Sequence, residues 1–206
     1  GAVTLNLFTS AVANELASTL SRIQASFVIV QDQEQADKLL DTRDSIKTVK
    51  AIVYVDPTGM RGYADNTLLV SFRDLLDLGR QHEQENPGLF EDEVRKAKED
   101  ETAHMIMTSG TTGVSKLAML MHRNYTAMGR KWIESSPVGI GTNWLSMTPP
   151  AWIVDQMWAF GVALMGGMVM NFPETPETVT SDFREIGPHL LISSSRFWEH
   201  LASKIR

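Results

Sequence analysis

The sequence predicts an α/β fold in which a largely parallel sheet is flanked by helices. Short apolar stretches rich in β-branched residues alternate with helical patterns of about 10–15 residues almost throughout the chain. Ser26–Val30 and Val49–Val55 are apolar on both alternating faces, which is typical of parallel strands buried on both sides. Ligands of such folds bind beyond the carboxyl ends of the strands, so the loops that follow strands are the expected functional sites.

The first predicted strand, Ala2–Phe8, precedes an amphipathic helix. Ser10 is of a residue type that caps helix amino termini, because its hydroxyl accepts a hydrogen bond from an amide of the first turn. A single apolar stripe at helical spacing is formed by Val12, Leu16, Leu20 and Ile23. We therefore expect this helix to begin at Ser10 and to bury that stripe.

The two apolar strands named above enclose a second helix. Asp32 follows the first of them, and Gln35 lies three residues later, a spacing that resembles a capping box and predicts a helix to about Leu40. Asp56–Gly59 ends the second strand with residues typical of turns. A polar loop is expected from there to Thr67.

The middle of the chain is predicted to be helical and acidic. A helix over Ser71–Gln84 is ended by Asn86–Gly88. Residues 82–101 hold eight acidic and three basic side chains. We expect an acidic surface segment near 82–101, with a helix or linker over Glu91–Glu101.

Strands and helices alternate again in the remaining chain. The strands are predicted over Ala103–Met107, Lys116–Met121, Asn143–Met147, Met168–Phe172 and His189–Ser193. The helices are predicted over Arg123–Ile133, Ile153–Met165 and Pro176–Ile186, and from Ser195 onward. Gly166 and Gly167 are expected to end the helix before them, because glycine accepts the left-handed conformation that closes many helices.

Composition excludes several classes of protein. The chain has 206 residues, 43% hydrophobic and 21% charged, so collagen-like, coiled-coil and disordered structures are excluded. Its length suits one domain, or one and a half at about 150 residues per domain. Without cysteine it has no disulfides, thiolate metal sites or cysteine nucleophile. A net charge of −6 argues against a nucleic-acid partner.

No membrane span or secretion signal is predicted. The longest stretch without a charged or strongly polar side chain is Met157–Met170, which is 14 residues long, whereas a span needs about 20. The amino terminus lacks a basic region followed by a short apolar core. We expect a cytoplasmic protein, for which peripheral contact with a membrane stays open.

The segment Thr108–Lys116 carries the strongest chemical signal. It contains five hydroxyl groups, two glycines and a lysine between two predicted strands. Glycine lets the backbone approach a ligand, while amides, hydroxyls and an ammonium group can neutralise polyphosphate oxygens. A Walker loop is excluded, because Ser115 and Leu117 flank the lysine and a strand, rather than a helix, follows. The competing interpretation is a plain Ser/Thr/Gly linker.

The letters T-S-G-T-T-G-x-x-K of this segment, placed after an apolar strand, resemble the phosphate-binding motif of the adenylate-forming (AMP-binding) superfamily. That superfamily includes acyl-CoA synthetases, peptide-synthetase adenylation domains and luciferases. The downstream text resembles one branch, the bacterial long-chain fatty-acid–CoA ligases, at Pro150–Ile153, Pro173–Glu174, Arg184–Pro188 and Arg196–Glu199. With Gly1–Leu40 also similar, the resemblance covers essentially the whole chain.

The resemblance implies a reaction and a set of binding residues. Family members convert a carboxylic acid and ATP, with Mg²⁺, to an acyl adenylate and pyrophosphate, and then transfer the acyl group to coenzyme A. The residues that would bind the nucleotide phosphates are Thr108, Ser109, Gly110, Thr111, Thr112, Gly113 and Lys116. Trp152 and Gln156 would line the acyl-substrate pocket, although Trp152 also suits a role in the core.

The chain departs from the family pattern in ways that leave alternatives open. Ser115 and Leu117 stand where the family has proline and glycine, and Ser194 and Ser195 replace two prolines. The family's later Thr-Glu motif, its ribose-binding aspartate and the small C-terminal domain with its lysine are not in this sequence. We therefore expect a partial large N-terminal domain over residues 1–206 that cannot form an acyl adenylate alone. The alternatives are a non-catalytic nucleotide- or acyl-binding member and a different adenylate-forming ligase.

Overall fold

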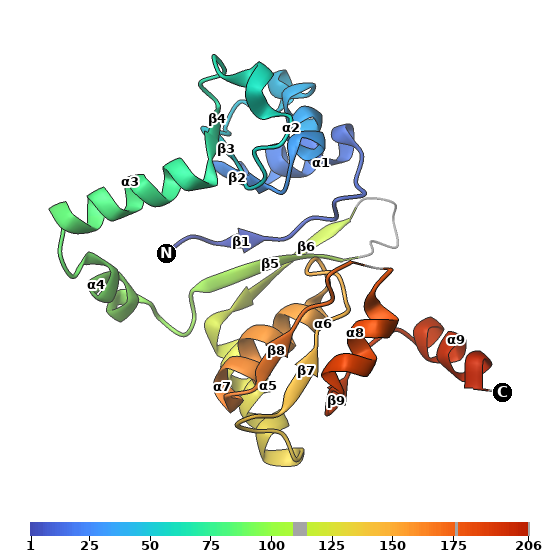
Figure 1. Cartoon of the computed structure of the whole chain (residues 1–206). Helices are drawn as coiled ribbons and strands as arrows, with labels where there is room; N and C mark the ends of the chain where they lie inside the picture. The colour runs from blue at the N-terminus through green and yellow to red at the C-terminus, as the bar shows by residue number, and fades with distance from the viewer. Residues whose placement is uncertain (109–114, 176, 206) are drawn as a thin grey trace. The chain divides into compact units, whose positions relative to one another are not determined.

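The α/β class is confirmed in the computed structural model, which describes residues 1–108, 115–175 and 177–205 (Figure 1). The strands in these residues form three sheets of three strands each, where the sequence predicts a single sheet. Five of the six strand pairings are parallel. The chain divides into two compact units, Thr9–Lys96 and Gly1–Phe8 with Ala97–Arg206.

The unit Thr9–Lys96 contains the parallel sheet β2-β3-β4. Its strands are β2 (Phe27–Val30), β3 (Ala51–Tyr54) and β4 (Leu69–Ser71). Its helices are α1 (Ala13–Arg22), α2 (Gln33–Leu40), α3 (Phe72–Glu85) and α4 (Leu89–Lys96). Two 3₁₀ turns, η1 (Arg43–Ser45) and η2 (Met60–Tyr63), complete the unit. Buried Ile52 and Val53 of β3 lie at the centre, with Ala36 and Leu39 of α2 also buried. Alternating sheet and helix residues thus supply one apolar core.

Three predictions for this unit are wrong. Helix α1 begins at Ala13 after Val12, and no side chain caps it, so Ser10 is not its cap. Strand β2 exposes Phe27 and Ile29, so it is not buried on both faces. Strand β4 was not predicted and includes Ser71, where the helix was expected to start. Three residues are too few to show a strand period in the sequence.

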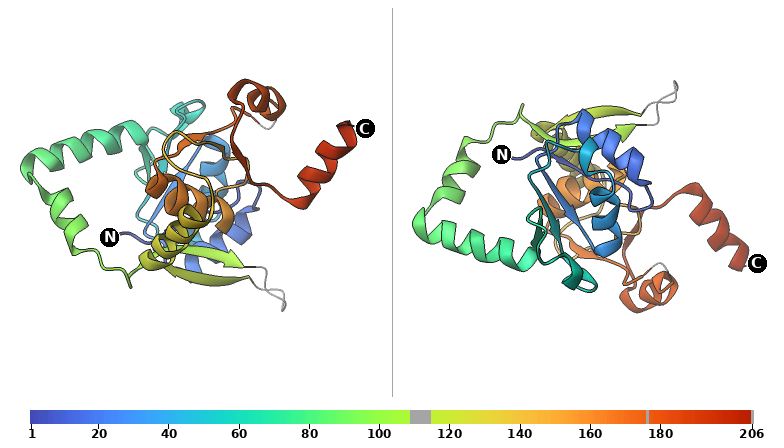
Figure 2. Two further views of the ribbon diagram at one scale, coloured as in Figure 1. Left: turned by 90° about the horizontal axis from the view of Figure 1, so that it is seen from below. Right: turned by 90° about the horizontal axis from the view of Figure 1, so that it is seen from above.

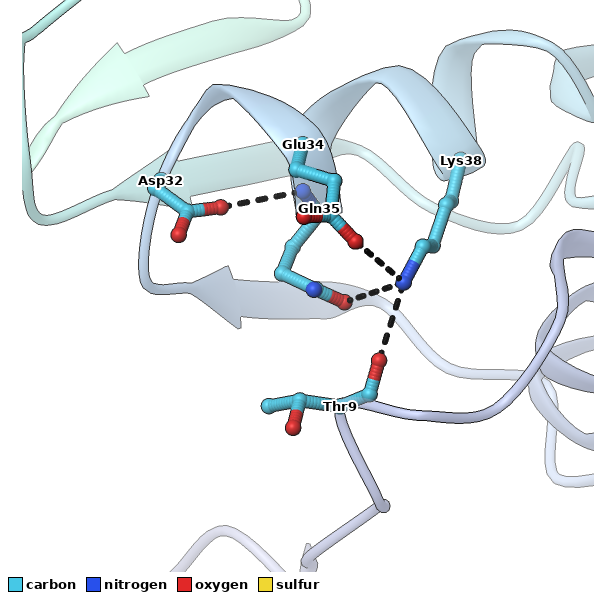
Figure 3. Close-up of polar contacts among 5 residues, drawn as sticks. All are labelled: Thr9, Asp32, Glu34, Gln35 and Lys38. Carbon is cyan, nitrogen blue, oxygen red and sulfur yellow. Dashed lines mark hydrogen bonds and ion pairs between the residues drawn. The ribbon is translucent and has the colours of Figure 1, made fainter. Parts of the chain in front are cut away.

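The start of α2 follows the predicted capping chemistry and extends it (Figure 3). The Asp32 carboxylate accepts a hydrogen bond from the Gln35 amide at 3.1 Å. The Lys38 ammonium donates to the Thr9 carbonyl at 2.9 Å and pairs with Glu34 at 3.0 Å. Because Thr9 is the first residue of this unit, Lys38 fixes the point at which the chain enters it.

Helix α3 also begins where the sequence predicts. The Ser71 hydroxyl accepts from the Asp74 amide at 3.0 Å, which satisfies one of the free amides of the first turn. Neither α3 nor α4 contains a buried residue, and all of residues 82–101 are exposed.

The second unit contains the other two sheets. In β1-β5-β6, strand β1 (Thr4–Leu5) is parallel to β5 (Thr102–Thr108), and β5 is antiparallel to β6 (Lys116–Met121). Figure 2 shows β5 and β6 side by side. The parallel sheet β8-β7-β9 consists of β7 (Asn143–Leu145), β8 (Val169–Asn171) and β9 (Leu190–Leu191). The helices are α5 (His122–Ser135), α6 (Ile153–Gln156), α7 (Leu164–Gly166), α8 (Val179–Ile186) and α9 (Ser195–Ile205). The first strand is much shorter than the predicted Ala2–Phe8.

The predicted helix Ile153–Met165 is interrupted by a π-helical segment, η3 (Met157–Ala163), between α6 and α7. Its residues are all apolar or glycine, so the sequence shows no period that would reveal the wider turn. Gly167 closes α7 in the left-handed conformation, as predicted. Trp144, Trp158 and Val162 form the buried centre of this region.

Helix α5 packs against η3 through two glycines. A Cβ atom added at Gly129 would lie 2.0 Å from the Gly161 carbonyl oxygen, and one added at Gly161 would lie 3.0 Å from the Tyr125 carbonyl oxygen. Both distances are shorter than ordinary contacts, so these backbones approach closely only because neither residue carries a side chain.

Gly129→Ala is expected to destabilise the second unit by about 1–3 kcal/mol, the usual cost of overpacking. All five tryptophans lie in this unit, so urea unfolding followed by tryptophan fluorescence measures the change. Gly166→Ala is the matched control, since its Cβ would meet Ile133 at an ordinary 3.6 Å. Equal stability of the two variants would contradict this packing.

Candidate functional site

The β5–β6 hairpin positions the two ends of the predicted phosphate loop. His104 and Ile106 of β5 are buried and hold that strand in the core, while Thr108, two residues further, is exposed. Thr108 and Lys116 are paired residues at the end of the hairpin. The Thr108 hydroxyl donates to the Lys116 carbonyl at 3.3 Å. The loop therefore follows the carboxyl end of a core strand, as the sequence predicts.

Of the predicted phosphate-binding residues, Thr108 and Lys116 are described. The others, Ser109, Gly110, Thr111, Thr112 and Gly113, lie outside the described residues. The Lys116 side chain is exposed and makes no ion pair within the described parts of the chain. Its ammonium group is thus available to an anion at the end of the hairpin.

The two predicted acyl-pocket residues lie at opposite ends of α6. Trp152 precedes the helix and its amide donates to the Pro149 carbonyl at 2.8 Å. Trp152 is 41% exposed, so it is not part of the core. Gln156 is 4% exposed, and its Nε2 donates to the Pro150 carbonyl at 2.7 Å. Gln156 thereby fixes the turn that carries the indole.

One oxygen of Gln156 has no partner in the described residues. Its Oε1 is buried and accepts no hydrogen bond there. A buried acceptor without a donor costs about 1–3 kcal/mol, so this oxygen is an exception among the buried polar groups of the described residues.

Asp155 is a buried acid beside Gln156 that sequence reasoning missed. Its Oδ1 accepts hydrogen bonds from the hydroxyls of Ser146 and Thr148, the latter at 3.2 Å. These contacts tie α6 to the segment that follows β7. The sequence did contain a signal, because Asp155 is a single carboxylate inside a long apolar stretch. A carboxylate buried in such a stretch needs hydrogen-bond partners.

Buried His104 of β5 lies against buried Tyr125 of α5. His104 Nδ1 is 2.6 Å from the Thr4 hydroxyl, and its ring meets Tyr125 edge to face at 6.5 Å. His104 Nε2 and the Tyr125 hydroxyl are buried without partners in the described residues. Burial lowers the pKa of His104 and raises the pKa of Tyr125 to about 12, because it disfavours both charged forms.

The two predicted sites are not joined by side-chain contacts. Within the described chain, no hydrogen bond or ion pair links Thr108 or Lys116 to Trp152 or Gln156. Two open cavities, of about 440 and 430 Å³, are lined by none of these four residues.

The described residues offer no candidate metal site and no membrane-spanning helix. They contain no group of three or more His, Asp or Glu side chains that could hold a metal ion, so we assign no magnesium ligands to them. None of their helices is long and apolar enough to cross a membrane.

Comparison with known proteins gives a family. A family model described as AMP-binding enzyme matches residues 1–206. The chain is 26% identical over 215 residues to the long-chain-fatty-acid–CoA ligase ACSBG2 of Mus musculus, and 24% identical over 212 residues to that of Homo sapiens. Each match covers 100% of this chain and 31% of the relative, so the chain spans about a third of their length.

Solved structures show the same fold. ATP-bound MatB from Rhodopseudomonas palustris matches with a TM-score of 0.66 at 17% identity, over 97% of this chain and 35% of that one. The inhibitor-bound N-terminal domain of FACL13 from Mycobacterium tuberculosis matches with a TM-score of 0.64 at 18% identity, over 90% of this chain and 42% of that one.

Buried His104 is expected to make stability depend on pH. Its pKa lies below the ordinary 6.5 in the folded chain, so the unfolded chain binds the proton more tightly. The contribution of His104 is fully present above about pH 6.5 and falls as the pH drops through that value towards the lowered pKa. Urea unfolding of wild type and His104→Gln at pH 7.5 and 5.5 measures it.

The variant should lose less stability on acidification than wild type. His200→Gln, which removes an exposed histidine of the same unit, is the control and should keep the wild-type pH dependence. An identical loss in wild type and His104→Gln would contradict the role of burial.

Proposed function

The chain belongs to the AMP-binding enzyme family, and we propose that the whole protein is an ATP-dependent ligase that joins long-chain fatty acids to coenzyme A. In the first step a carboxylate oxygen bonds to the α-phosphorus of ATP, and pyrophosphate leaves. In the second step the thiol sulfur of coenzyme A bonds to the acyl carbon, and AMP leaves with release of the thiol proton. Mg²⁺ is expected to accompany the nucleotide.

The hairpin end carries the proposal. We assign Thr108, Ser109, Gly110, Thr111, Thr112, Gly113 and Lys116 to the β- and γ-phosphates. The described ends support this role, since the loop at the carboxyl end of β5 is flanked by a hydroxyl and by an ammonium group that forms no ion pair with another described residue. Held in place by the core strand, they would orient the departing pyrophosphate and neutralise its charge.

The second site supplies acyl recognition in this proposal. The exposed indole of Trp152 offers a large apolar face to an alkyl chain, while Gln156 holds its turn from beneath. The fatty-acid branch rests on the downstream motifs and on the named relatives. Membership of the bacterial branch of these ligases stays a prediction, and it rests on the downstream motifs alone.

A different function is favoured by one feature. Ser115 and Leu117 depart from the family pattern beside the lysine, which suits a non-catalytic member that only binds nucleotide or acyl groups. Acid-dependent exchange of labelled pyrophosphate into ATP by the whole protein separates the two functions. No exchange with any fatty acid would favour the binding protein.

In the whole protein, Lys116→Ala is expected to lower that exchange about a hundredfold, because one preorganised phosphate contact is lost. Lys131→Ala, which removes an exposed cation of α5, is the control and should leave the rate unchanged. A Lys116→Ala rate within twofold of wild type would exclude the phosphate role.

We also propose that these 206 residues release no pyrophosphate alone.

Trp152→Ala is expected to raise KM for long fatty acids several-fold while changing KM for short acids little, because it removes apolar contact area. Trp198→Ala offers a matched control, since Trp198 is 40% exposed against 41% for Trp152. Steady-state kinetics over a series of chain lengths measures both. Equal effects of the two variants would argue against an acyl role for Trp152.

A further inference from the structure

The unit Thr9–Lys96 contains a cavity that the proposed ligase function does not use. It is open, has a volume of about 440 Å³, and lies where β3 and β4 begin. Its walls are formed by Leu40, Arg43, Lys50, Asn66, Thr67 and Leu68. These residues come from the end of α2, from η1 and from the segments that precede the two strands, so the fold itself gathers them (Figure 1).

Arg43 is held in the cavity wall by the backbone. One terminal nitrogen of its guanidinium group donates to the carbonyls of Ile46 and Val49, at 3.2 and 3.3 Å. A guanidinium group has five N–H donors, and the remaining ones have no partner among the described residues. The guanidinium group is therefore oriented before any ligand binds, and its remaining N–H groups are available as donors.

Lys50 supplies a second positive charge to the same cavity. Its backbone amide is fixed by a 2.8 Å hydrogen bond to the Ser26 carbonyl, while its side chain is exposed. In the described parts of the chain, neither Lys50 nor Arg43 forms an ion pair. Two cations that share a cavity without acidic partners repel each other, and a bound anion would remove that repulsion.

The remaining walls add neutral donors. The Asn66 Oδ1 accepts from the Leu68 amide at 3.1 Å, which fixes the turn and leaves the Asn66 NH₂ group as the free end of that side chain. Thr67 contributes a hydroxyl. Asp41 and Asp44 flank Arg43 in sequence but do not line the cavity. Its lining is thus a set of donors and positive charges above two leucines.

We propose that this cavity binds a phosphate group, either free or carried by a small organic molecule whose apolar part contacts Leu40 and Leu68. A phosphate dianion matches two cations in charge, and its oxygens accept from guanidinium, ammonium, amide and hydroxyl donors together. The proposal does not depend on the ligase function, because the cavity and the β5–β6 hairpin lie in different units.

The test is a titration of the 206-residue chain with inorganic phosphate and with phenyl phosphate, at constant ionic strength kept with chloride, followed by amide NMR shifts. Saturable shifts are expected at residues 50 and 66–68. Lys50→Gln should weaken binding roughly tenfold, as expected for loss of a charge-assisted hydrogen bond. Lys50→Arg should restore it. Tighter binding of phenyl phosphate would identify an organic ligand, and equal binding a free phosphate.

Two control variants separate this site from other cations. Lys47→Gln removes an exposed charge from the same connection without touching the cavity, and it should leave the affinity unchanged. Lys116→Ala, at the proposed nucleotide site, should leave the phosphate-induced shifts at residues 50 and 66–68 as in wild type. The proposal is overturned if residues 50 and 66–68 do not shift, if Lys50→Gln binds equally well, or if Lys116→Ala abolishes the shifts.

Discussion

The antiparallel pairing of β5 with β6 is the constraint on which the proposed chemistry depends. Burial of His104 and Ile106 fixes β5 in the core, and the register then sets Thr108 opposite Lys116. A loop that carries charge and hydroxyls is useful only if its ends are held, because fixed donors lose little entropy when a phosphate binds. In the proposed function, β5 and β6 hold Thr108 and Lys116 in place, and the residues between them supply phosphate donors.

The packing behind the hairpin is unusually close and polar for a core. Gly129 and Gly161 let two helical backbones approach without side chains, and the π-helical turn of η3 forms one side of that contact. Burial also disfavours the charged forms of His104 and Tyr125, and within the described residues His104 Nε2 and the Tyr125 hydroxyl have no hydrogen-bond partner. These features lower the folding stability of the region, as is common near sites that bind ligands.

Sequence patterns predicted the alternation of elements and pointed to the loop between β5 and β6, because caps, turns and hydroxyl-rich loops are local signals. The assignment of Trp152 and Gln156 came from the family resemblance and stays a prediction. The Asp32 cap occurs as predicted, a helix follows Ser71 as predicted, and Gly167 ends its helix. Longer-range outcomes were not predictable. Nothing local distinguishes one sheet from three, and the apolar faces of β2 give no sign that Phe27 and Ile29 are exposed. Asp155 was missed because its hydroxyl partners come together only on folding.

The central claim is that the end of the β5–β6 hairpin holds the phosphates of ATP. A crystal structure of the whole protein with ATP tests it most directly. The account predicts that the Lys116 ammonium and the loop between β5 and β6 lie within hydrogen-bond distance of the β- and γ-phosphate oxygens. Phosphates bound elsewhere, with the Lys116 ammonium paired to a carboxylate of its own chain, would contradict it.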